Sequence, residues 1–561
     1  MTDIRIFAAR RVVTMNPSNP SATHVAVRDG RVLGAGTLDE VRGWGPSELD
    51  DTFRDHVLVP GMIDVHSHVF EGLSGSFPYH GRFGRHAADG RFMPGVATLD
   101  ELLADLRRVD AEMTAAADDP HAPPEPLVSL GFDPVHLPGV RLDRHHLDTV
   151  STTRPIFVFH ASMHVATVNS AMLARHGIDR HTVATGVVRD ADGEPTGELH
   201  ELPAIALVAS ALAPIMRAAS ADSTILDFGR LALRAGLTSV GELGGQLLQR
   251  PAAVDTWSRL VNDPSFPVRV TIHNLGVPPG GDGDHDAAAA ALVALRDRHS
   301  TDKLRFPGVK FVIDGSIQGW TAMMNWPGYY TGTDHGQLLT VPEQFVDWVR
   351  PYHRASIPVH VHCNGTATID LWLDTVEQLV REDPWLDHRH TIQHSQLTTE
   401  AQLRRAKNLG MCVNIFANHL WYWGDVHYEQ TVGPERANRL EPCGTAERLG
   451  VPYSLHSDAS VTPLGPLHLM WCAVNRLTPS GRVLGEHEKI TPYQALWAVT
   501  QGSAYQLHLD HLMGSIECGK YADFTVLDDD PLGVDPMALR DIGVWGTVLG
   551  GVARPVDRTD G

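Results

Sequence analysis

One pattern recurs along the middle of the chain: a short apolar run is followed by a stretch with the composition of a helix. Eight runs with helical segments between them favour a (β/α)8 TIM-like barrel within the α/β class. The runs cover residues 63–65, 237–242, 268–272, 309–313, 359–362, 391–394, 412–416 and 453–456, and helix candidates between them include 223–234 and 400–409.

A gap of about 170 residues separates the first two runs, which is too long for a loop within one domain. It contains further apolar runs at 127–130 and 156–160, and an alanine-rich helix at 202–213 that Pro214 should end or kink. Counting 156–160 as a barrel strand would give nine strands, so we assign this run to the gap. The gap therefore predicts an inserted α/β domain over residues 71–220.

The two ends of the chain differ from the middle in their pattern of predicted secondary structure. Short β-like runs separated by Asn-Pro and Asp-Gly turns occupy the first 58 residues, and similar runs return at 522–527 and 544–549. We therefore expect a composite β-sandwich assembled from both termini. The predicted domains are this β-sandwich from 1–58 and 510–561, the catalytic barrel from 59–70 and 221–509, and the insertion from 71–220.

Charge and composition exclude several classes of partner. The net charge of −21 argues against a nucleic acid, whose phosphates would be repelled, and no apolar stretch of 18 residues suggests a membrane span. Five cysteines without C-x-x-C spacing read as reduced thiols, and the N-terminus has no apolar run of signal-peptide length, so a cytoplasmic protein is expected. A small-molecule substrate remains, and the oligomeric state stays open, with a homodimer as one alternative.

Two histidines, His66 and His68, follow the first run after a Pro-Gly corner. Side chains at positions i and i+2 of a strand leave the same face, so the two imidazoles point the same way, about 7 Å apart along the backbone. Two converging imidazoles can bind one divalent cation. The alternative is a chance pair, because the chain contains 32 histidines. The metal interpretation therefore depends on the other runs.

Further candidate ligands fall at or near the C-terminal ends of later runs, where barrel enzymes place their chemistry. Lys310 lies in the fourth run, His360 and His362 in the fifth, His394 in the sixth and Asp458 just after the eighth. The lysine could instead be a buried salt-bridge partner, the aspartate could cap a helix, and His360 is favoured as a neighbour of the ligands. The whole set in barrel order nevertheless favours one binuclear site.

Lysine is rare in this chain, with five lysines against 41 arginines. A lysine on a buried strand therefore needs a reason. An amine can lose its proton and react with carbon dioxide, whereas a guanidinium stays charged and cannot. Lys310 is accordingly a candidate for this modification.

These residues lie in stretches that resemble the amidohydrolase superfamily, and the surrounding sequence looks like its amidohydrolase-3 (YtcJ-like) branch. The resemblance spans nearly the whole chain; it is highly specific for the fold and weakly specific for the substrate. The matching stretches are 60–68 (Pro-Gly-Met-Ile-Asp-Val-His-Ser-His), 308–316, 362–365, 393–396, 457–461, 514–523 and, in the insertion, 164–170.

The resemblance implies a metal-dependent barrel beside a composite β-sandwich. A mixture of imidazoles, a carboxylate and a modified lysine suits zinc, so two zinc ions per chain are expected. In the implied site His66 and His68 bind the more buried metal, His362 and His394 bind the more exposed metal, carboxylated Lys310 bridges both, and Asp458 binds a metal and carries protons.

The chain departs from the branch at two positions that bear on the site. Thr366 stands where the branch usually has Asp, which removes an expected carboxylate, and His456 stands where it usually has Gly. By strand alternation His456 shares a face with Asp458. Aromatic residues cluster at 320–330 and 416–423, where they either form the pocket rim or cover the barrel mouth and pack against the insertion. The residues expected to contact substrate are Trp320, His456, His360 and His164.

The sequence thus predicts a metal-dependent hydrolase acting on a non-peptide carbon–nitrogen bond, in an amide, N-acyl or N-formyl group. Metal-activated water would attack, and Asp458 would act as the catalytic proton shuttle. An apolar or aryl-bearing substrate fits the aromatic residues best. Two alternatives remain open: the same fold can host a decarboxylase or an isomerase, and a non-catalytic binding protein is conceivable.

Overall fold

A computed structural model describes residues 4–557 except 118, 120–122, 138, 140, 277–282 and 333–334. The chain divides into two compact units. The first comprises residues 1–68, 229–459 and 463–561, and the second comprises 69–228 and 460–462. Residues 69–70, 221–228 and 460–462, which the sequence-based boundaries placed in the barrel, thus belong to the second unit.

The first unit contains the predicted barrel of eight parallel strands. Their hydrogen-bonded order is β20-β19-β18-β17-β16-β14-β13-β5, and each apolar run supplies one strand; a short strand, β15 (Leu304–Arg305), pairs with β14 outside this path. The barrel strands are β5 (Met62–Ser67), β13 (Leu237–Gly245), β14 (Arg269–Leu275), β16 (Val309–Val312), β17 (Val359–Cys363), β18 (Thr391–His394), β19 (Cys412–Ile415) and β20 (Tyr453–Leu455).

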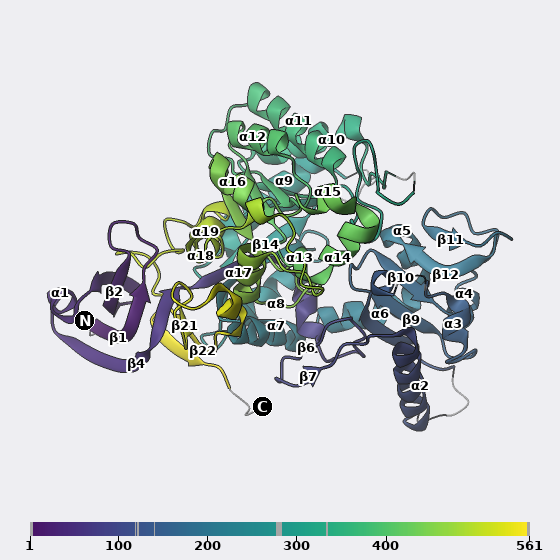
Figure 1. Cartoon of the computed structure of the whole chain (residues 1–561), viewed down its shortest axis with the longest axis horizontal. Helices are drawn as coiled ribbons and strands as arrows, with labels where there is room; N and C mark the ends of the chain where they lie inside the picture. Colours follow the sequence, from purple (N-terminus) through teal and green to yellow (C-terminus); the bar gives the residue numbers. More distant parts are fainter. Residues whose placement is uncertain are drawn as a thin grey trace. The chain divides into compact units, whose positions relative to one another are not determined.

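Helices alternate with the barrel strands along the chain, and in Figure 1 α9 to α12 lie together beside the strands. Both expected helices form, as α7 (Asp222–Arg234), whose residues up to Phe228 belong to the second unit, and α12 (Glu400–Asn408) in the first. The latter begins at a capping box, in which Thr399 Oγ1 accepts from the backbone N–H of Gln402. Other helices of this unit are α1 (Leu38–Arg42), α8 (Ala252–Val261), α9 (His285–His299), α10 (Pro342–Arg354), α11 (Thr366–Glu382), α13 (His419–Tyr422), α14 (Gly424–Val426), α15 (Gly433–Ala437), α16 (Cys443–Leu449), α17 (Pro466–Asn475), α18 (Pro492–Ala498) and α19 (Gln501–Gln506).

The barrel closes between β5 and the segment that follows β20. Ser67 forms a parallel bridge with Ala459, and the backbone N–H of Asp458 donates to the carbonyl oxygen of His66 at 3.0 Å. These contacts hold the residues after the last strand next to the histidines of the first strand. The two ends of the barrel sequence therefore meet at the predicted metal site.

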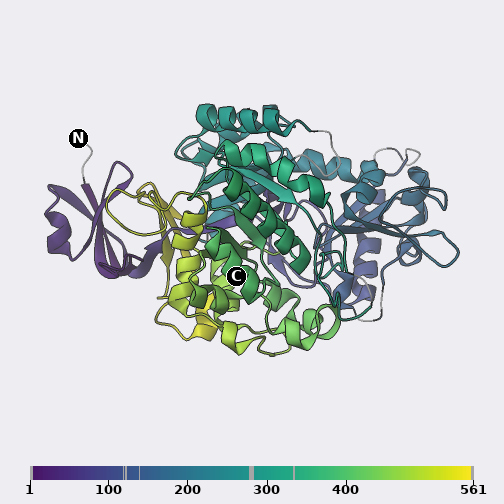
Figure 2. The ribbon, with the colours of Figure 1, turned by 90° about the horizontal axis from the view of Figure 1, so that it is seen from above.

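Both ends of the chain contribute to one β-domain, as predicted. Its seven strands pair in the order β23-β22-β21-β4-β1-β2-β3, and the purple N-terminal and yellow C-terminal segments lie side by side in Figures 1 and 2. Phe7, Phe53 and Phe524 belong to its core, with the rings of Phe7 and Phe53 5.4 Å apart. The strands are β1 (Ile4–Val13), β2 (Ser21–Arg28), β3 (Arg31–Gly36), β4 (Ser47–Pro60), β21 (Phe524–Leu527), β22 (Val544–Leu549) and β23 (Val552–Pro555).

The second unit is an α/β domain, as predicted. Its main sheet has the order β11-β12-β10-β9-β8, in which β8 and β9 are parallel and the other pairs antiparallel. The run at 156–160 forms β9 and thus lies outside the barrel. The elements are α2 (Leu99–Ala115), β8 (Leu127–Phe132), α3 (Arg144–Asp148), β9 (Ile156–His160), β10 (Val165–Val168), α4 (Ser170–Arg175), β11 (Val187–Arg189), β12 (Pro195–His200), α5 (Glu201–Ile205) and α6 (Ala209–Ala219), with a small sheet of β6 (Arg85–His86) and β7 (Phe92–Met93).

Pro214 was expected to end or kink the alanine-rich helix; the helix does not end there, and a kink stays a prediction. Pro214 lies inside α6, and the interruption occurs earlier, at a 3-10 turn over Ala206–Val208. Proline removes one backbone donor from the helix. Burial of Ala211 and Ile215 on the same helix outweighs that loss, because apolar packing stabilises a helix more than local propensity does.

Among the described residues, no single helix has the length and apolar composition needed to cross a membrane. The helical segments Pro203–Ala219 and Asp222–Arg234 meet that requirement only as a pair, across a bend of 65°.

Candidate metal centre

The six predicted ligands come together at the C-terminal ends of the barrel strands, all within the first unit. They are linked by contacts between side chains, and five of them are buried; the sixth, His68, has a side chain that is 22% exposed. The ligands are His66 in β5, His68 directly after it, Lys310 in β16, His362 in β17, His394 at the end of β18 and Asp458 after β20.

Asp458 and two histidines form one half of the centre. Asp458 Oδ1 lies 3.3 Å from His66 Nε2 and 3.2 Å from His68 Nε2. Lys310 Nζ lies 3.3 Å from the same His66 Nε2. Two imidazole nitrogens, a carboxylate oxygen and an amine thus face one another at separations that a single divalent cation could bridge.

The tautomer of His66 follows from its hydrogen bonds on the other side. Gln393 Oε1 lies 2.7 Å from His66 Nδ1 and also accepts from Asn414 Nδ2 at 2.7 Å. Gln393 turns its Nε2 to His360 Nδ1 at 2.7 Å, so its Oε1 is the atom that faces His66. His66 Nδ1 therefore carries the proton, which leaves the lone pair of Nε2 directed at the centre.

Two further histidines form the other half. His394 Nε2 lies 2.8 Å from His362 Nδ1. On its far side, His362 Nε2 lies 3.1 Å from the carbonyl oxygen of Gly315 and 2.9 Å from Asn364 Nδ2, which donates to the same carbonyl at 2.8 Å. Asp458 Oδ2 lies 3.7 Å from His394 Nδ1, so the two oxygens of this carboxylate face different histidines.

The backbone at two of these positions is unusual. His394 has φ 70° and Asp458 has φ 52°, which is the left-handed region that non-glycine residues rarely adopt. Such strain persists only where the surrounding structure imposes it, and it concentrates at functional sites. It turns both side chains at the ends of their strands.

Burial sets the charge state of the imidazoles. Burial, together with neighbouring positive groups, lowers the pKa values of His66 and His394 well below the usual range. Neutral imidazole is the form that binds a metal. For His68, burial is outweighed by the carboxylates of Asp458 and Glu242, which raise its pKa to about 9. These carboxylates therefore favour a positive charge at the place where His68 Nε2 and Asp458 Oδ1 meet.

Lys310 and Asp458 are shifted in ways that suit their expected roles. Burial lowers the pKa of Lys310 to about 7, although Asp458 acts in the opposite direction. Part of the amine is then uncharged at neutral pH. For Asp458, burial alone would raise the pKa, but hydrogen bonding and charge from His68 lower it to about 2. Its carboxylate is ionised at neutral pH and its side chain remains 12% exposed.

Two carboxylates support the ligands without having been predicted to do so. Asp64 Oδ1 accepts from the backbone N–H of His66, and its Oδ2 accepts from both the N–H and the hydroxyl of Ser457. Glu242 Oε1 lies 3.3 Å from His68 Nδ1. The alternation of β5 places Asp64 on the face of His66, so this signal was present in the sequence.

A third carboxylate bears on the departure at Thr366. Asp314 Oδ1 lies 3.6 Å from His362 Nε2, and its two oxygens accept from the backbone N–H groups of Asn364 and Gly365. Thr366 instead accepts from a backbone N–H with its hydroxyl. A carboxylate is thus present beside His362 although it comes from β16's C-terminal end, not from the position after β17.

His456, the second departure, lies inside the cluster. Its Nε2 is 3.2 Å from His394 Nδ1, and its ring stacks on that of His66 with centroids 4.6 Å apart. It is fully buried, and its Nδ1 has no hydrogen-bond partner among the residues that the structure describes. The ligand nitrogens of His66, His394 and His456 lie within 4.8 Å of one another.

The other predicted substrate residues occupy different surroundings. His360 is fully buried and its Nδ1 accepts from Gln393 Nε2 at 2.7 Å, which places it behind His66. Trp320 packs against a hydrophobic cluster of the first unit. His164 belongs to the second unit, where its Nδ1 lies 2.8 Å from Glu201 Oε2.

The aromatic runs divide between core and surface. Met324, Tyr329 and Trp423 are buried, the first two within the same hydrophobic cluster, whereas Trp326 is 89% and Tyr330 57% exposed. Most of these side chains therefore cover the first unit or face solvent. Whether any of them covers the barrel mouth or forms a pocket rim stays a prediction.

The donor set fits a divalent cation. His362 Nδ1 and His394 Nε2 are only 2.8 Å apart, and Asp458 Oδ1 lies 3.3 Å from His66 Nε2 and 3.2 Å from His68 Nε2. Nitrogen and carboxylate ligands in this mixture suit zinc better than magnesium or calcium.

A (β/α)8 barrel with imidazole, amine and carboxylate groups gathered at the C-terminal ends of its strands has the arrangement of a barrel enzyme. A model of the amidohydrolase family matches residues 54–554. The chain therefore belongs to the amidohydrolase family, as its sequence motifs indicated. It is an enzyme of the kind that hydrolyses carbon–nitrogen bonds other than peptide bonds.

Curated relatives match along almost the whole chain. An N-substituted formamide deformylase of Arthrobacter pascens is 27% identical over 99% of this chain and 98% of its own length. The protein YtcJ of Bacillus subtilis (strain 168) is 24% identical over 96% of this chain and 97% of its own length.

Among solved structures, an uncharacterized metal-dependent hydrolase from Pyrococcus horikoshii OT3 is similar in fold. It superposes with a TM-score of 0.69 at 20% identity, covering 95% of this chain and 99% of its own.

Proposed function

We propose that this amidohydrolase uses two divalent cations to hydrolyse an N-formyl or other N-acyl bond in a small, apolar or aryl-bearing molecule. The observation that carries the proposal is the position of Asp458, whose two oxygens face two separate histidine groups. The similarity to an N-substituted formamide deformylase supports the formyl group as the first candidate.

Each half of the centre is proposed to bind one cation. Zinc is the cation that this donor set suits best. Lys310 is proposed to be carboxylated on its amine, because the carbamate would supply two oxygens in place of a cation beside the metals. One cation would be held by His66, His68 and Asp458, the other by His362 and His394, with carboxylated Lys310 between them.

The cations, when bound, supply Lewis acidity that makes a water molecule acidic and polarises the carbonyl group of the substrate. Asp458 is ionised at neutral pH and reaches both halves of the centre, so its carboxylate can accept the proton of the attacking water. The same carboxylate then gives this proton to the nitrogen that leaves. The products are an amine and a carboxylic acid, which is formic acid when the substrate is a formamide.

Turnover of a small panel of compounds tests this proposal. Aryl and benzyl formamides, the corresponding acetamides, and aryl carboxylic acids would be incubated with the purified protein, with and without added zinc. Release of amine and acid from a formamide or acetamide is expected. Loss of carbon dioxide from the aryl acids, without amide hydrolysis, would instead show a decarboxylase.

We expect the purified protein to contain close to two zinc ions per chain, because the ligands form two groups joined through Asp458. Elemental analysis of protein grown without added chelator measures this directly. A folded, active sample without stoichiometric metal would contradict the proposal. A metal content near one ion per chain would show that Lys310 does not bridge two metals.

We expect His456→Ala to lower metal affinity by about 10- to 100-fold, the usual effect of losing a hydrogen-bond partner of a metal ligand. For His394 Nε2 to bind metal, Nδ1 must carry the proton, and His456 Nε2 at 3.2 Å is placed to accept it. Metal retained after dialysis against a graded chelator measures the effect. The matched control is His511→Ala, at an exposed position; equal metal loss in both variants would count against the interaction.

A further inference from the structure

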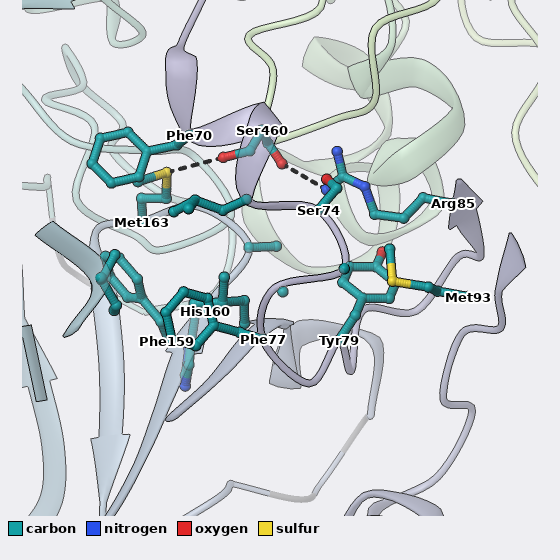
Figure 3. A pocket seen from close by; sticks show the side chains of 16 residues that line it. Phe70, Ser74, Phe77, Tyr79, Arg85, Met93, Phe159, His160, Met163 and Ser460 are labelled. Carbon is teal, nitrogen blue, oxygen red and sulfur yellow. Dashed lines mark hydrogen bonds between the residues drawn. The ribbon is translucent and has the colours of Figure 1, made fainter. Parts of the chain in front are cut away.

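The second unit contains a pocket of its own, which Figure 3 shows lined by side chains such as Phe77, Phe159 and Met163. It encloses about 50 Å³. This is room for a few water molecules and far below the roughly 300 Å³ at which pockets for small molecules begin. No ligand is therefore assigned to it, and the groups that bear on the proposed reaction are found in the first unit.

Two histidines and a threonine outside the metal centre form a chain of hydrogen bonds after strand β19. His419 begins α13, and its Nδ1 lies 3.0 Å from His427 Nε2. His427 Nδ1 in turn lies 2.8 Å from Thr431 Oγ1. His427 and Thr431 are the two ends of a π-helical turn, a rare conformation that is frequent at functional sites. All three side chains are buried.

One aromatic ring separates this chain of hydrogen bonds from the metal centre. The ring of Phe416, directly after β19, has its centroid 4.6 Å from that of His419 and 4.8 Å from that of His456. It also lies 6.0 Å from the ring of His394, one of the proposed metal ligands. Because the segments that follow barrel strands carry the groups that meet substrate, His419 is placed to contact a molecule bound at the metals.

The buried hydroxyl of Thr431 determines which nitrogen of His419 carries the proton. Among the described residues, this hydroxyl has His427 Nδ1 as its one hydrogen-bond partner. A buried hydroxyl proton without an acceptor is costly, so the hydroxyl donates to Nδ1. His427 then carries its proton on Nε2 and donates to His419 Nδ1, which leaves the proton of His419 on Nε2.

His419 therefore offers a neutral donor. Burial, together with His427 and His456, lowers the pKa of His419 well below the usual range, so the ring is uncharged at neutral pH. No residue that the structure describes accepts a hydrogen bond from its Nε2, and the side chain is 2% exposed. A donor of this kind suits the acyl oxygen of a substrate, because negative charge grows on that atom when water attacks the carbonyl carbon.

We propose that His419 is a catalytic residue whose Nε2–H donates a hydrogen bond to the acyl oxygen of the substrate, and that His427 and Thr431 are positioning residues that keep the proton on that nitrogen. The inference rests on the proposed function and adds to it a residue outside the metal ligands. The proton stays on Nε2 throughout, so the bonds made and broken are those of the hydrolysis alone.

Two substitutions that differ only in reach test the contact. The amide nitrogen of glutamine can take the place of His419 Nε2, whereas that of asparagine lies closer to the backbone. His419→Asn should therefore lower kcat for the best formamide by about 10²- to 10³-fold, with a much smaller change in KM, and His419→Gln should lose less. Metal content should not change in either variant. His511→Gln, at an exposed position, is the matched control.

A second pair of variants tests the positioning residues. Thr431→Val removes the hydroxyl and keeps the shape of the side chain, so kcat should fall by about 2- to 10-fold, the value of one neutral hydrogen bond. Thr431→Ser keeps the hydroxyl and should retain wild-type kcat. Nitrogen-15 NMR of histidine-labelled protein, in which the signals lost in His419→Gln identify His419, should show the proton on Nε2. A proton on Nδ1 would overturn the inference.

The outcomes separate this inference from the proposed function. If the wild-type protein hydrolyses a formamide or acetamide and metal-loaded His419→Asn keeps the wild-type kcat, the inference is wrong and the proposed function stands. If His419→Asn does not fold, the comparison of Thr431→Val with Thr431→Ser decides in the same way. If the wild-type protein hydrolyses no amide, the proposed function fails and the role of His419 fails with it.

Discussion

Lys310→Ala should lose metal and activity together, with turnover falling by at least about 100-fold. Lys310 Nζ lies 3.3 Å from His66 Nε2, in a buried position that lowers the pKa of the amine to about 7. A free ammonium at this place would repel divalent cations, whereas a carbamate would bind them. Elemental analysis and turnover of the best formamide, measured on the same preparation, would show both losses.

Chemical rescue distinguishes a lost ligand from a damaged fold. A short carboxylic acid such as propionate should partly restore metal and activity to Lys310→Ala, because it supplies the missing oxygens. Lys310→Arg should not be rescued, since its permanent charge would keep the metals out. Lys407→Ala, at an exposed lysine, is the matched control. An electron-density map with an unmodified Lys310 amine turned away from an occupied metal site would refute the bridge.

The barrel could be predicted because each of its strands is a short apolar run and the runs recur with helices between them. The same reasoning separated the run at 156–160, which forms β9 of the second unit. Of the two outcomes expected at Pro214, the end of the helix is wrong, because the helix continues with Ala211 and Ile215 buried. Helix propensity is a property of one segment alone, and tertiary packing can override it.

The gathering of His66 and Asp458 at one site could be predicted, because a barrel brings the C-terminal ends of all its strands to one face. The residues that orient the ligands could not be assigned in the same way. Gln393 bonds His66 across 327 positions of the chain, and Glu242 contacts His68 across 174. No local spacing encodes such contacts, although Gln393 stands directly before a predicted ligand.

The carboxylate that Thr366 lacks shows a related limit. A motif comparison shows that one residue differs from the family pattern, but it does not show which other side chains lie near that position. Asp314 lies within a matching stretch, yet its distance of 3.6 Å to His362 Nε2 depends on the pairing of β16 with β17. The chemistry of a site is therefore better judged from the groups that surround an atom in space than from one residue that differs from a motif.

Asp458→Asn should lower kcat by about 10²- to 10⁴-fold and leave KM nearly unchanged. Asparagine keeps the shape of the side chain and one oxygen, but it cannot accept and return a proton at neutral pH. The wild-type carboxylate has a pKa of about 2 and is therefore ionised across the neutral range. Because Asp458 also contacts His66 and His68, turnover must be measured after the variant has been reloaded with zinc and its metal content determined.

The metal content of the Asp458→Asn variant determines how a loss of its turnover is interpreted. A fully loaded Asp458→Asn variant that is slow identifies a proton carrier, whereas a variant that cannot be loaded identifies a ligand. Asp374→Asn, at an exposed aspartate of α11, is the matched control and should behave as wild type. Wild-type turnover in a loaded Asp458→Asn variant would remove Asp458 from the mechanism. The base would then have to be sought among the neighbouring groups, of which His456 is the nearest to His394 Nδ1, at 3.2 Å.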